Sequence, residues 1–210
     1  MAWPIRLAGV VCALGVCSLP QAGDAEFSGK VVLEVLDDLA LDHKLRLLQD
    51  FAFHDERGRV WLAPQGAVLD GWSIPRELRA LPGLPLESEY RKSAVVHDFH
   101  SRARTQPWRD VHRMLYFAAL TEGIPPSEAN VLYMTVYASG WRWEPKPSSC
   151  YGSCHAAAEL LTWRPDAKAA ELEPIAAWLQ QSSPRLEEID KRVDAALKRP
   201  GPHLFAQVRQ

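Results

Sequence analysis

The side chains best suited to chemistry gather in one short stretch of the sequence. His97 and Asp98 are adjacent in the segment Y-R-K-S-A-V-V-H-D-F-H, and Asp110 follows in the segment W-R-D-V-H-R-M-L-Y. An imidazole held by one carboxylate can act as a general base, while a second carboxylate can orient water or bind a cation. We therefore predict His97 and Asp110 as catalytic residues and Asp98 as the ligand of a divalent cation.

A third segment, P-Q-G-A-V-L-D-G-W-S-I-P, adds Asp70 and Ser73 as candidate catalytic residues. Both residues also have an ordinary structural interpretation. Asp-Gly is a common turn dipeptide, and serine is favoured at the entrance of a helix. The segment is too rich in proline and glycine to form a long regular element.

Helical geometry brings part of this set together. In its predicted helix, Asp110 lines up with Met114 and Phe117 at the edge of the apolar face, where it can point towards the preceding helix. His97 and Asp110 are then expected to meet in a shared crevice, with Asp98 beside them. Two alternatives stay open. In the first, His97 and Asp98 lie on a solvated face or bridge two helices. In the second, Asp110 stands in the first turn of its helix only because the helix dipole favours an acidic residue there.

The elements that must position these residues fall into two groups. From residue 27 to residue 75, alternating apolar residues indicate β-strands, with a hairpin turn at D-E-R-G, residues 55–58. The helical period then predicts helices over residues 88–103, 107–122 and 126–139, and over two stretches between residues 166 and 199. This order predicts an α+β fold, with an N-terminal antiparallel β-hairpin or small sheet packed on a C-terminal helical bundle.

The start of the chain has the parts of a secretory signal. Arg6 precedes an apolar stretch over residues 7–19, and small residues follow at Ala22 and Ala25. We predict residues 1–25 as a signal peptide that is cleaved after Ala25, or alternatively after Ala22. The protein is then periplasmic or secreted. A buried N-terminal helix is the other interpretation of the same stretch.

The cysteines depend on that prediction. Cys17 raises the alternative of a lipoprotein, which Val16 disfavours because a lipoprotein signal has a small residue before its cysteine. Removal of the leader leaves Cys150 and Cys154. In an oxidising compartment such an isolated pair is expected to form a local disulfide. A metal site that includes His155 and a pair of free thiols are the alternatives.

Composition excludes several classes of protein. The chain is 47% hydrophobic and 24% charged, as is usual for a globular domain. Its 24 basic residues against 26 acidic ones give a net charge of −2, so it lacks the basic excess of proteins that bind nucleic acid. No apolar run approaches the roughly 20 residues of a membrane-spanning helix.

Taken together, the motifs resemble those of domain-of-unknown-function family 1353 (DUF1353), a group of small, uncharacterised proteins of bacteria and phages. The family pattern is similar to F-x-D-x-x-G-x-x-W-x-x-P-x-G, followed by D-G-x-S-I-P, an A-x-x-H-D segment and an acid early in the next helix. The resemblance covers about residues 45–142. The matching positions are Phe53, Asp55, Gly58, Trp61, Pro64, Gly66, Asp70, Gly71, Ser73, Ile74, Pro75, Ala94, His97, Asp98 and Asp110.

The resemblance implies a shared site, formed by His97 and the aspartates at 70, 98 and 110, without naming its reaction. Trp72 stands where the family usually has a small residue, and His100 stands where an aromatic such as Tyr is common. The bulk of the indole can narrow a pocket at this place. The resemblance also divides the mature chain into a family-like core over residues 26–142 and a helical C-terminal extension over residues 143–210.

The His-Asp pair is also similar, locally, to the site of secreted phospholipases A2. In those enzymes a helical His is the base, the following Asp binds calcium and a second carboxylate orients the His. His97, Asp98 and Asp110 would take these roles. The disulfide scaffold and the Gly-rich calcium loop are absent from this sequence, so the likeness is one of site only.

These observations favour functions of different classes. One is an envelope hydrolase that cleaves an ester, amide or phosphoester in a small substrate, with water activated by His97. The other is a non-catalytic module that binds an envelope component or, through the C-terminal extension, a partner protein. The many tryptophans favour the second function, because aromatic anchors are common at interfaces. In a third interpretation, His97, Asp98 and Asp110 form a structural polar network without a ligand.

Overall fold

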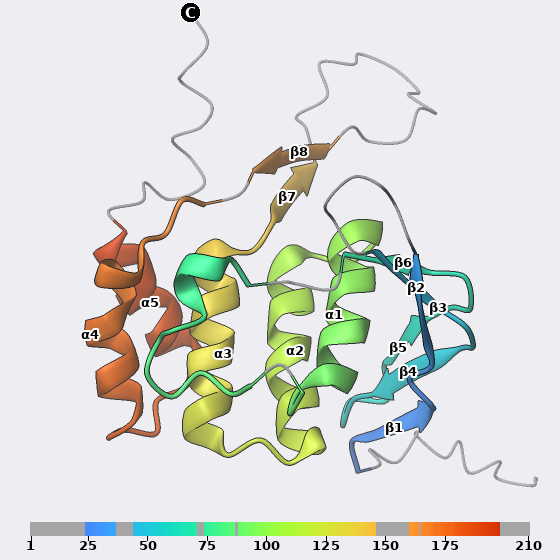
Figure 1. Ribbon diagram of the computed structural model, residues 1–210. Helices are drawn as coiled ribbons and strands as arrows, with labels where there is room; N and C mark the ends of the chain where they lie inside the picture. Colours follow the sequence, from blue (N-terminus) through green and yellow to red (C-terminus); the bar gives the residue numbers. More distant parts are fainter. Residues whose placement is uncertain are drawn as a thin grey trace, which may run out of the picture.

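A computed structural model describes residues 24–36, 44–70, 74–86, 88–145, 160–163 and 165–197 of the 210-residue chain. Within these ranges short strands come first and five α-helices follow (Figure 1). The α+β fold predicted from the sequence is therefore confirmed. One further pair of antiparallel strands, β7 (Arg142–Pro145) and β8 (Leu160–Trp163), lies in the extension and was not predicted.

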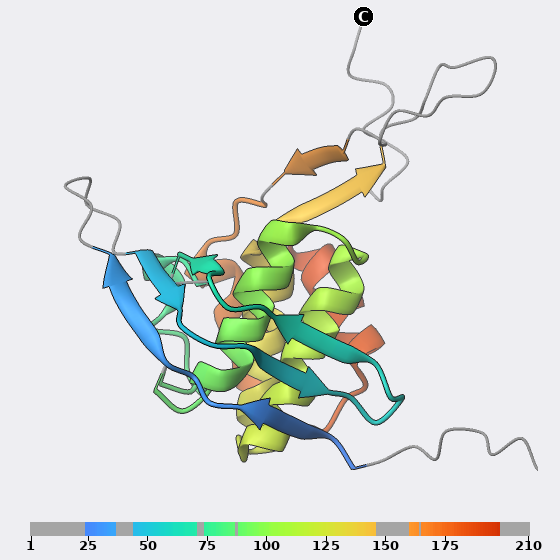
Figure 2. The same ribbon diagram turned by 90° about the vertical axis from the view of Figure 1, so that its right-hand side faces the viewer.

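Six strands form an antiparallel layer from three passes of the chain. The sheet orders are β1-β4-β5 and β2-β3-β6, so the pass that contains β3 and β4 lies in the middle. Figure 2 shows this layer lying across the helices. β4, β5 and β6 contact the first helix, α1 (Arg91–Ala103). The strands are β1 (Glu26–Gly29), β2 (Leu33–Leu36), β3 (Lys44–Leu47), β4 (Phe51–His54), β5 (Val60–Ala63) and β6 (Val68–Leu69).

Alternating side chains make one face of this layer apolar. Phe51 and Phe53 of β4 pair with Ala63 and Trp61 of β5, and all four are buried. They share a face because successive residues of a strand point to opposite sides. The ring of Phe27 stacks on Phe51 with 5.6 Å between the ring centroids. This face is the part of the core that the first helix covers.

The predicted hairpin turn at residues 55–58 is confirmed, and its motif residues shape it. The Asp55 carboxylate accepts hydrogen bonds from the backbone N–H groups of Arg57 and Arg59, at 3.0 and 2.9 Å. It also accepts one from Trp61 Nε1 at 3.1 Å. Gly58 has a φ of +76°, which residues with a Cβ rarely adopt. Asp55, Gly58 and Trp61 therefore have structural roles that account for their place in the motif.

Three helices after the strands lie side by side and match the predicted segments (Figure 1). They are α1 (Arg91–Ala103), α2 (Trp108–Glu122) and α3 (Pro126–Ser139). α2 follows Pro107 and ends at Gly123, whose φ of +102° stops the helical path. As the sequence predicts, none of the helices in the described ranges has the length and hydropathy that a membrane span requires.

The two helices of the predicted extension pack into the same core. α4 (Ala169–Leu179) and α5 (Leu186–Ala196) both contact α3, on the side away from the strands (Figure 1). Leu172, Leu179 and Ile189 are fully buried in the apolar cluster that α2 and α3 share. α3 is buried along most of its length because helices surround it. The extension is therefore an integral part of the hydrophobic core.

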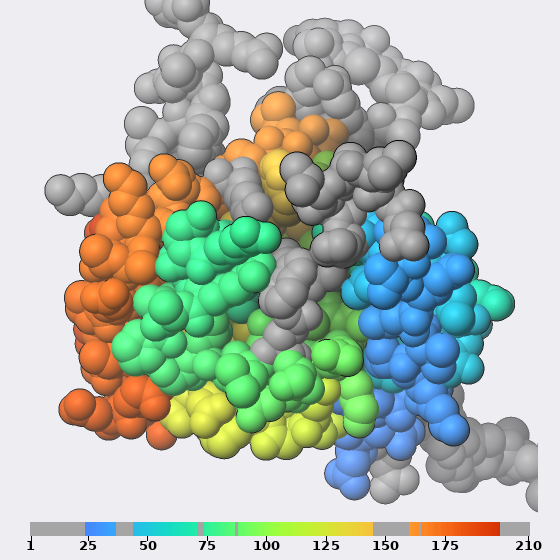
Figure 3. Space-filling view, viewed as in Figure 1, coloured from blue at the N-terminus to red at the C-terminus, as the bar shows by residue number. Residues whose placement is uncertain are grey.

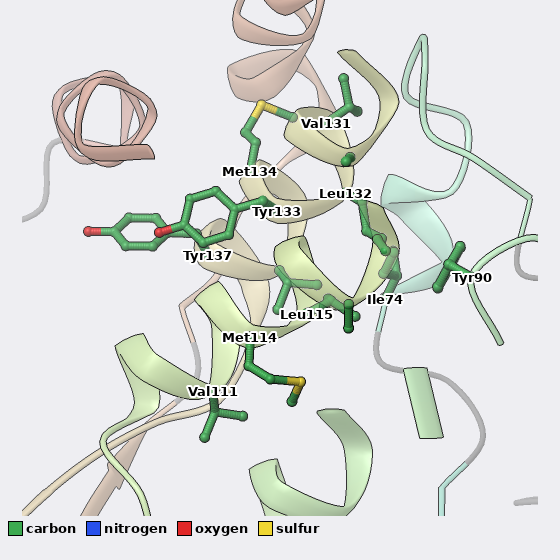
Figure 4. Packing of buried hydrophobic residues seen from close by; sticks show 14 of the residues in the cluster. Ile74, Tyr90, Val111, Met114, Leu115, Val131, Leu132, Tyr133, Met134 and Tyr137 are labelled. Carbon is green, nitrogen blue, oxygen red and sulfur yellow. The ribbon is translucent and has the colours of Figure 1, made fainter. Parts of the chain in front are cut away.

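Polar contacts fix the seam between α3 and α5. Tyr133 donates a hydrogen bond to Asp190 at 2.6 Å, and Tyr137 donates one to Asp194 at 3.0 Å. Figure 4 shows both phenol rings extending from α3 to the same side. Burial raises the pKa of Tyr137 to about 12, so its hydroxyl keeps its proton and stays a donor at neutral pH. These contacts set the register of α5 on α3.

The segment over residues 74–86 links the strands to α1 and crosses the helices on its way. Ile74, Leu78 and Leu81 are buried beneath it. Gly83 lies against the side chain of Gln180 at the end of α4, and its φ of +76° favours glycine. In Figure 3 this segment, in green, lies beside the orange surface of α4. The link thus joins the family-like core to the extension.

Two predictions concern residues that the structure does not describe. Residues 1–23 of the predicted signal peptide lie outside the described ranges, and so do Cys150 and Cys154. Export and the local disulfide stay predictions.

Candidate functional site

His97 lies at the interface of α1 and α2 and is only 2% exposed. Its Nε2 is 2.9 Å from Nδ1 of His112, and the hydroxyl of Ser101 is 3.3 Å from the same His97 nitrogen. Nε2 of His112 lies 3.1 Å from the carbonyl oxygen of Trp141. Since that carbonyl can only accept, His112 donates from Nε2 and, in its neutral form, accepts at Nδ1. His97 then donates from Nε2.

Burial keeps both rings of this pair neutral. Burial, with a smaller contribution from the nearby His100, lowers the pKa of His97 to about 3. Burial also holds the pKa of His112 well below its ordinary value, with His97 and Arg142 acting in the same direction. The His97–His112 pair is therefore an uncharged link between α1, α2 and the end of α3.

His100 is a second buried imidazole on α1. It is 8% exposed, and neither of its ring nitrogens has a hydrogen-bond partner. Its ring meets those of Trp61 and Phe99 edge-on, with 5.1 Å between centroids in each case. Burial lowers the pKa of His100 to about 4. Neutral imidazole is again the form that the fold accommodates.

Asp98 and Asp70 lie close together, as predicted, and their contacts hold the end of β6 against α1. Asp98 Oδ2 accepts a hydrogen bond from the backbone N–H of Asp70 at 2.7 Å, which holds the end of β6 against α1. The Asp70 carboxylate forms an ion pair with Arg102, one turn further along α1. No group of three or more His, Cys, Asp or Glu within the described ranges is placed to hold a metal ion. Ser73 lies outside those ranges.

Asp110 does not meet His97, which corrects the expected pairing. Its carboxylate forms an ion pair with Arg59 at 3.3 Å, and both side chains are 43% exposed. The guanidinium of Arg59 also lies over the Trp61 ring, 5.0 Å from its centroid. Asp110 shares a face of α2 with Phe117, as predicted, but this face is turned to the hairpin and α5 rather than to α1.

His112 is the partner that sequence reasoning missed. The sequence could have indicated this role, because His112 lies on the apolar stripe of α2, in line with Leu115 and Ala119. Both of these residues are buried. A histidine on such a stripe points into the core, where its nitrogens need partners. Another histidine at the facing position of α1 supplies one of them.

An open groove of about 920 Å³ lies along the other face of α2. Its walls are the β4–β5 turn, α2 and residues 184–187 at the start of α5. Asp110 and Arg59 pair in one wall, and Arg113 pairs with Glu187 at 3.1 Å in another. Phe117, 43% exposed, supplies an apolar surface between them. Of the residues predicted for the site, Asp110 alone of those described lines this groove.

A substitution at Gly140 tests whether the His97–His112 pair contributes to stability. A Cβ at this position would lie 2.5 Å from the carbonyl oxygen of Val136 and 2.9 Å from Cε1 and Nε2 of His112, so Gly140→Ala is expected to strain the end of α3 and to push His112 away from His97 and Trp141. Overpacking of this kind typically costs about 1–3 kcal/mol of unfolding free energy. Urea denaturation of the variant measures the loss.

A double-mutant cycle gives the control for this prediction. In a His112→Ala background the clash with the ring is gone and only the clash with the Val136 carbonyl remains, so Gly140→Ala should cost less there than in the wild type. The expected coupling is about 0.5–3 kcal/mol. Equal costs in the two backgrounds would show that Gly140 does not act through His112.

Comparison with known proteins agrees with the motif pattern. Residues 45–136 match the family described as "Protein of unknown function (DUF1353)". The resemblance noted in the sequence is therefore confirmed over residues 45–136. It spans β3 to most of α3, so α4 and α5 lie outside it.

Two curated relatives come from Sinorhizobium fredii (strain NBRC 101917 / NGR234). The chain is 34% identical over 102 residues to the uncharacterized protein y4jT, an alignment that covers 48% of this chain and 30% of the relative. It is 37% identical over 101 residues to the uncharacterized protein y4iH, covering 48% of this chain and 42% of the relative. The chain thus spans less than half the length of either relative. No solved structure matches it.

Proposed function

We propose that this protein is a non-catalytic binding domain of the cell envelope, with its ligand in the groove between the β4–β5 turn, α2 and α5. The observation that carries the proposal is the groove itself, whose volume of about 920 Å³ lies within the size range of ligand sites. It combines half-exposed ion pairs with an exposed phenylalanine. Such sites use apolar surface for affinity and a few polar groups for orientation.

The alternative, a hydrolase that uses His97, has less support. A general base must reach a water molecule and needs a pKa near the working pH. The His97 ring is 2% exposed, its Nε2 faces His112, and burial lowers its pKa to about 3. The cation proposed at Asp98 has no three-ligand group within the described ranges. These observations favour the binding function over water activation by His97.

A co-sedimentation experiment tests the binding function. Purified peptidoglycan sacculi and phospholipid vesicles are incubated separately with the wild type and with Phe117→Ala and Arg59→Ala. We expect the wild type to sediment with one of these fractions, and each variant to bind at least about tenfold more weakly, as for central contact residues. Leu86→Ala is the control because Leu86 is 70% exposed and lies outside the groove.

The outcomes separate the two functions. Equal binding by the groove variants and the wild type contradicts the groove as the ligand site. Release of soluble products from either fraction by the wild type, lost in a folded His97→Asn variant, contradicts the non-catalytic function and supports the hydrolase.

The envelope location rests on the predicted signal peptide of residues 1–25. A mature chain that begins at Glu26 and is recovered from the periplasm or the medium would support it. A full-length chain confined to the cytoplasm would contradict it. N-terminal sequencing after cell fractionation distinguishes the two.

A further inference from the structure

We infer that the ligand of this groove is a neutral, polyhydroxylated saccharide chain. This inference rests on the proposed binding function and names the class of its ligand. Three observations support it: the balance of charges in the groove, the unused hydrogen-bonding capacity of its ion pairs, and its exposed aromatic surface.

The charges of the groove cancel. Among the described residues that line it, four arginines face four carboxylates. A site for a polyanion or an acidic lipid headgroup would have an excess of cations. This groove has none, so it has no net charge with which to attract either. The arginines are Arg57, Arg59, Arg113 and Arg185, and the acids are Asp55, Glu56, Asp110 and Glu187.

The ion pairs leave hydrogen-bonding capacity unused. The Arg59–Asp110 pair is joined through one guanidinium nitrogen and one carboxylate oxygen, and both side chains are 43% exposed. A guanidinium has five N–H donors, and a carboxylate accepts about four hydrogen bonds. Arg57 has no ion-pair partner within the described ranges and adds further donors. A sugar hydroxyl both donates and accepts, so neighbouring hydroxyls can bridge such a pair without any charge of their own.

Aromatic surface lies beside these pairs. Phe117 is 43% exposed and lines the groove, and the ring of Tyr116 stands edge-on to it at 5.2 Å between centroids. The face of an aromatic ring is electron-rich and apolar. The C–H face of a pyranose ring is apolar and slightly positive, so it complements this surface while its hydroxyls reach the ion pairs.

An extended peptide is the competing ligand for this groove. A peptide that adds to a sheet needs an unpaired strand edge. β4, which lines the groove with Phe53, is paired on both sides, but β5, which lines it with Trp61, is the edge strand of its sheet, so a stem-peptide probe is needed to test this mode of binding. At about 920 Å³ the groove has room for several sugar rings.

Calorimetric titration of the mature chain tests this inference with separate probes. They are chitotetraose (a neutral chain of N-acetylglucosamine, a sugar of the envelope glycan), maltotetraose, the peptidoglycan stem peptide, and vesicles with anionic lipid. We expect binding of a glycan probe, weakened at least about tenfold by Phe117→Ala and unchanged by Leu86→Ala. Binding of chitotetraose but not of maltotetraose would identify an acetylated amino-sugar chain, as in the envelope glycan, as the source.

Salt separates a neutral ligand from a charged one. Raising the salt from about 0.05 to about 0.5 M shortens the screening length severalfold. We expect the glycan affinity to change by less than about threefold, whereas affinity for a charged ligand would fall much further. Groove-dependent binding of the stem peptide or the vesicles, without glycan binding, overturns the saccharide inference and leaves the binding function standing. Binding of no probe overturns both.

Discussion

Acidification from pH 7 to pH 5 is expected to remove about 4 kcal/mol or more from the free energy of unfolding. His97 and His100 have folded pKa values of about 3 and about 4, against an ordinary value of 6.5. Below pH 6.5 the unfolded chain binds protons at these positions and the folded chain does not. Each histidine therefore lowers stability by about 1.4 kcal/mol per pH unit as the pH falls to its folded pKa.

His112 acts in the same direction, because burial lowers its pKa as well. Asp190, whose pKa burial raises, opposes the trend, but it is one carboxyl against three imidazoles. The expected loss is a large part of the roughly 5–15 kcal/mol that holds a typical domain together. Urea titrations at pH 7, 6 and 5, with recovery at pH 7 to exclude irreversible damage, measure it.

One variant assigns the effect to a named ring. His100→Leu removes an imidazole that has no hydrogen-bond partner, so the slope of stability against pH should fall by about 1.4 kcal/mol per unit. At pH 7 the variant is expected to be as stable as the wild type or more so, since an unsatisfied buried polar group is lost. An unchanged slope would mean that His100 takes up protons in the folded state.

Truncation of the chain after residue 163 is expected to abolish cooperative folding. It removes α4 and α5 and uncovers the side of α3 that carries Tyr133 and Tyr137, both fully buried in the intact chain. Burial of one large aliphatic side chain contributes about 1.5–3 kcal/mol. Loss of four fully buried ones therefore costs about as much as a whole domain is stable. They are Leu172, Leu179, Ile189 and Val193.

Near-ultraviolet circular dichroism and thermal melts measure this effect. Point variants calibrate it: Leu179→Ala should cost about 2–5 kcal/mol, whereas Leu161→Ala, at an exposed position, should change little. A truncated chain with a cooperative transition at the wild-type midpoint would show that the extension is an accessory to an independent family-like core. Deletion of the extension is therefore no clean test of partner binding.

The local features of this fold follow from the sequence. Alternating apolar residues, the Asp55 turn and the prolines and glycines around α2 predict the strands, the hairpin and the helices because each signal acts within a few residues of its own element. The association of Asp98 with Asp70 was also within reach, since both belong to one motif set and one of them ends a strand next to a helix.

The sequence did not allow us to predict which side chains contact one another across different helices. The sequence places Asp110 correctly beside Phe117 on α2, yet it does not say which element covers that face. Arg113 on the same helix pairs with Asp190 of α5, 77 positions further along the chain. Such a contact depends on how α5 docks against α3, and helical periodicity carries no information about that docking.

What the sequence determined by itself is the set of elements, their order and the side chains that share a face of each. Tertiary structure decided which faces meet. The rotation of α2 about its axis directs His112 to His97 and turns Asp110 towards Arg59. Burial then keeps the two imidazoles neutral, while the acid remains half-exposed in a groove. The physical reason is that a side chain's charge and chemistry depend on its surroundings, which residues distant in sequence supply.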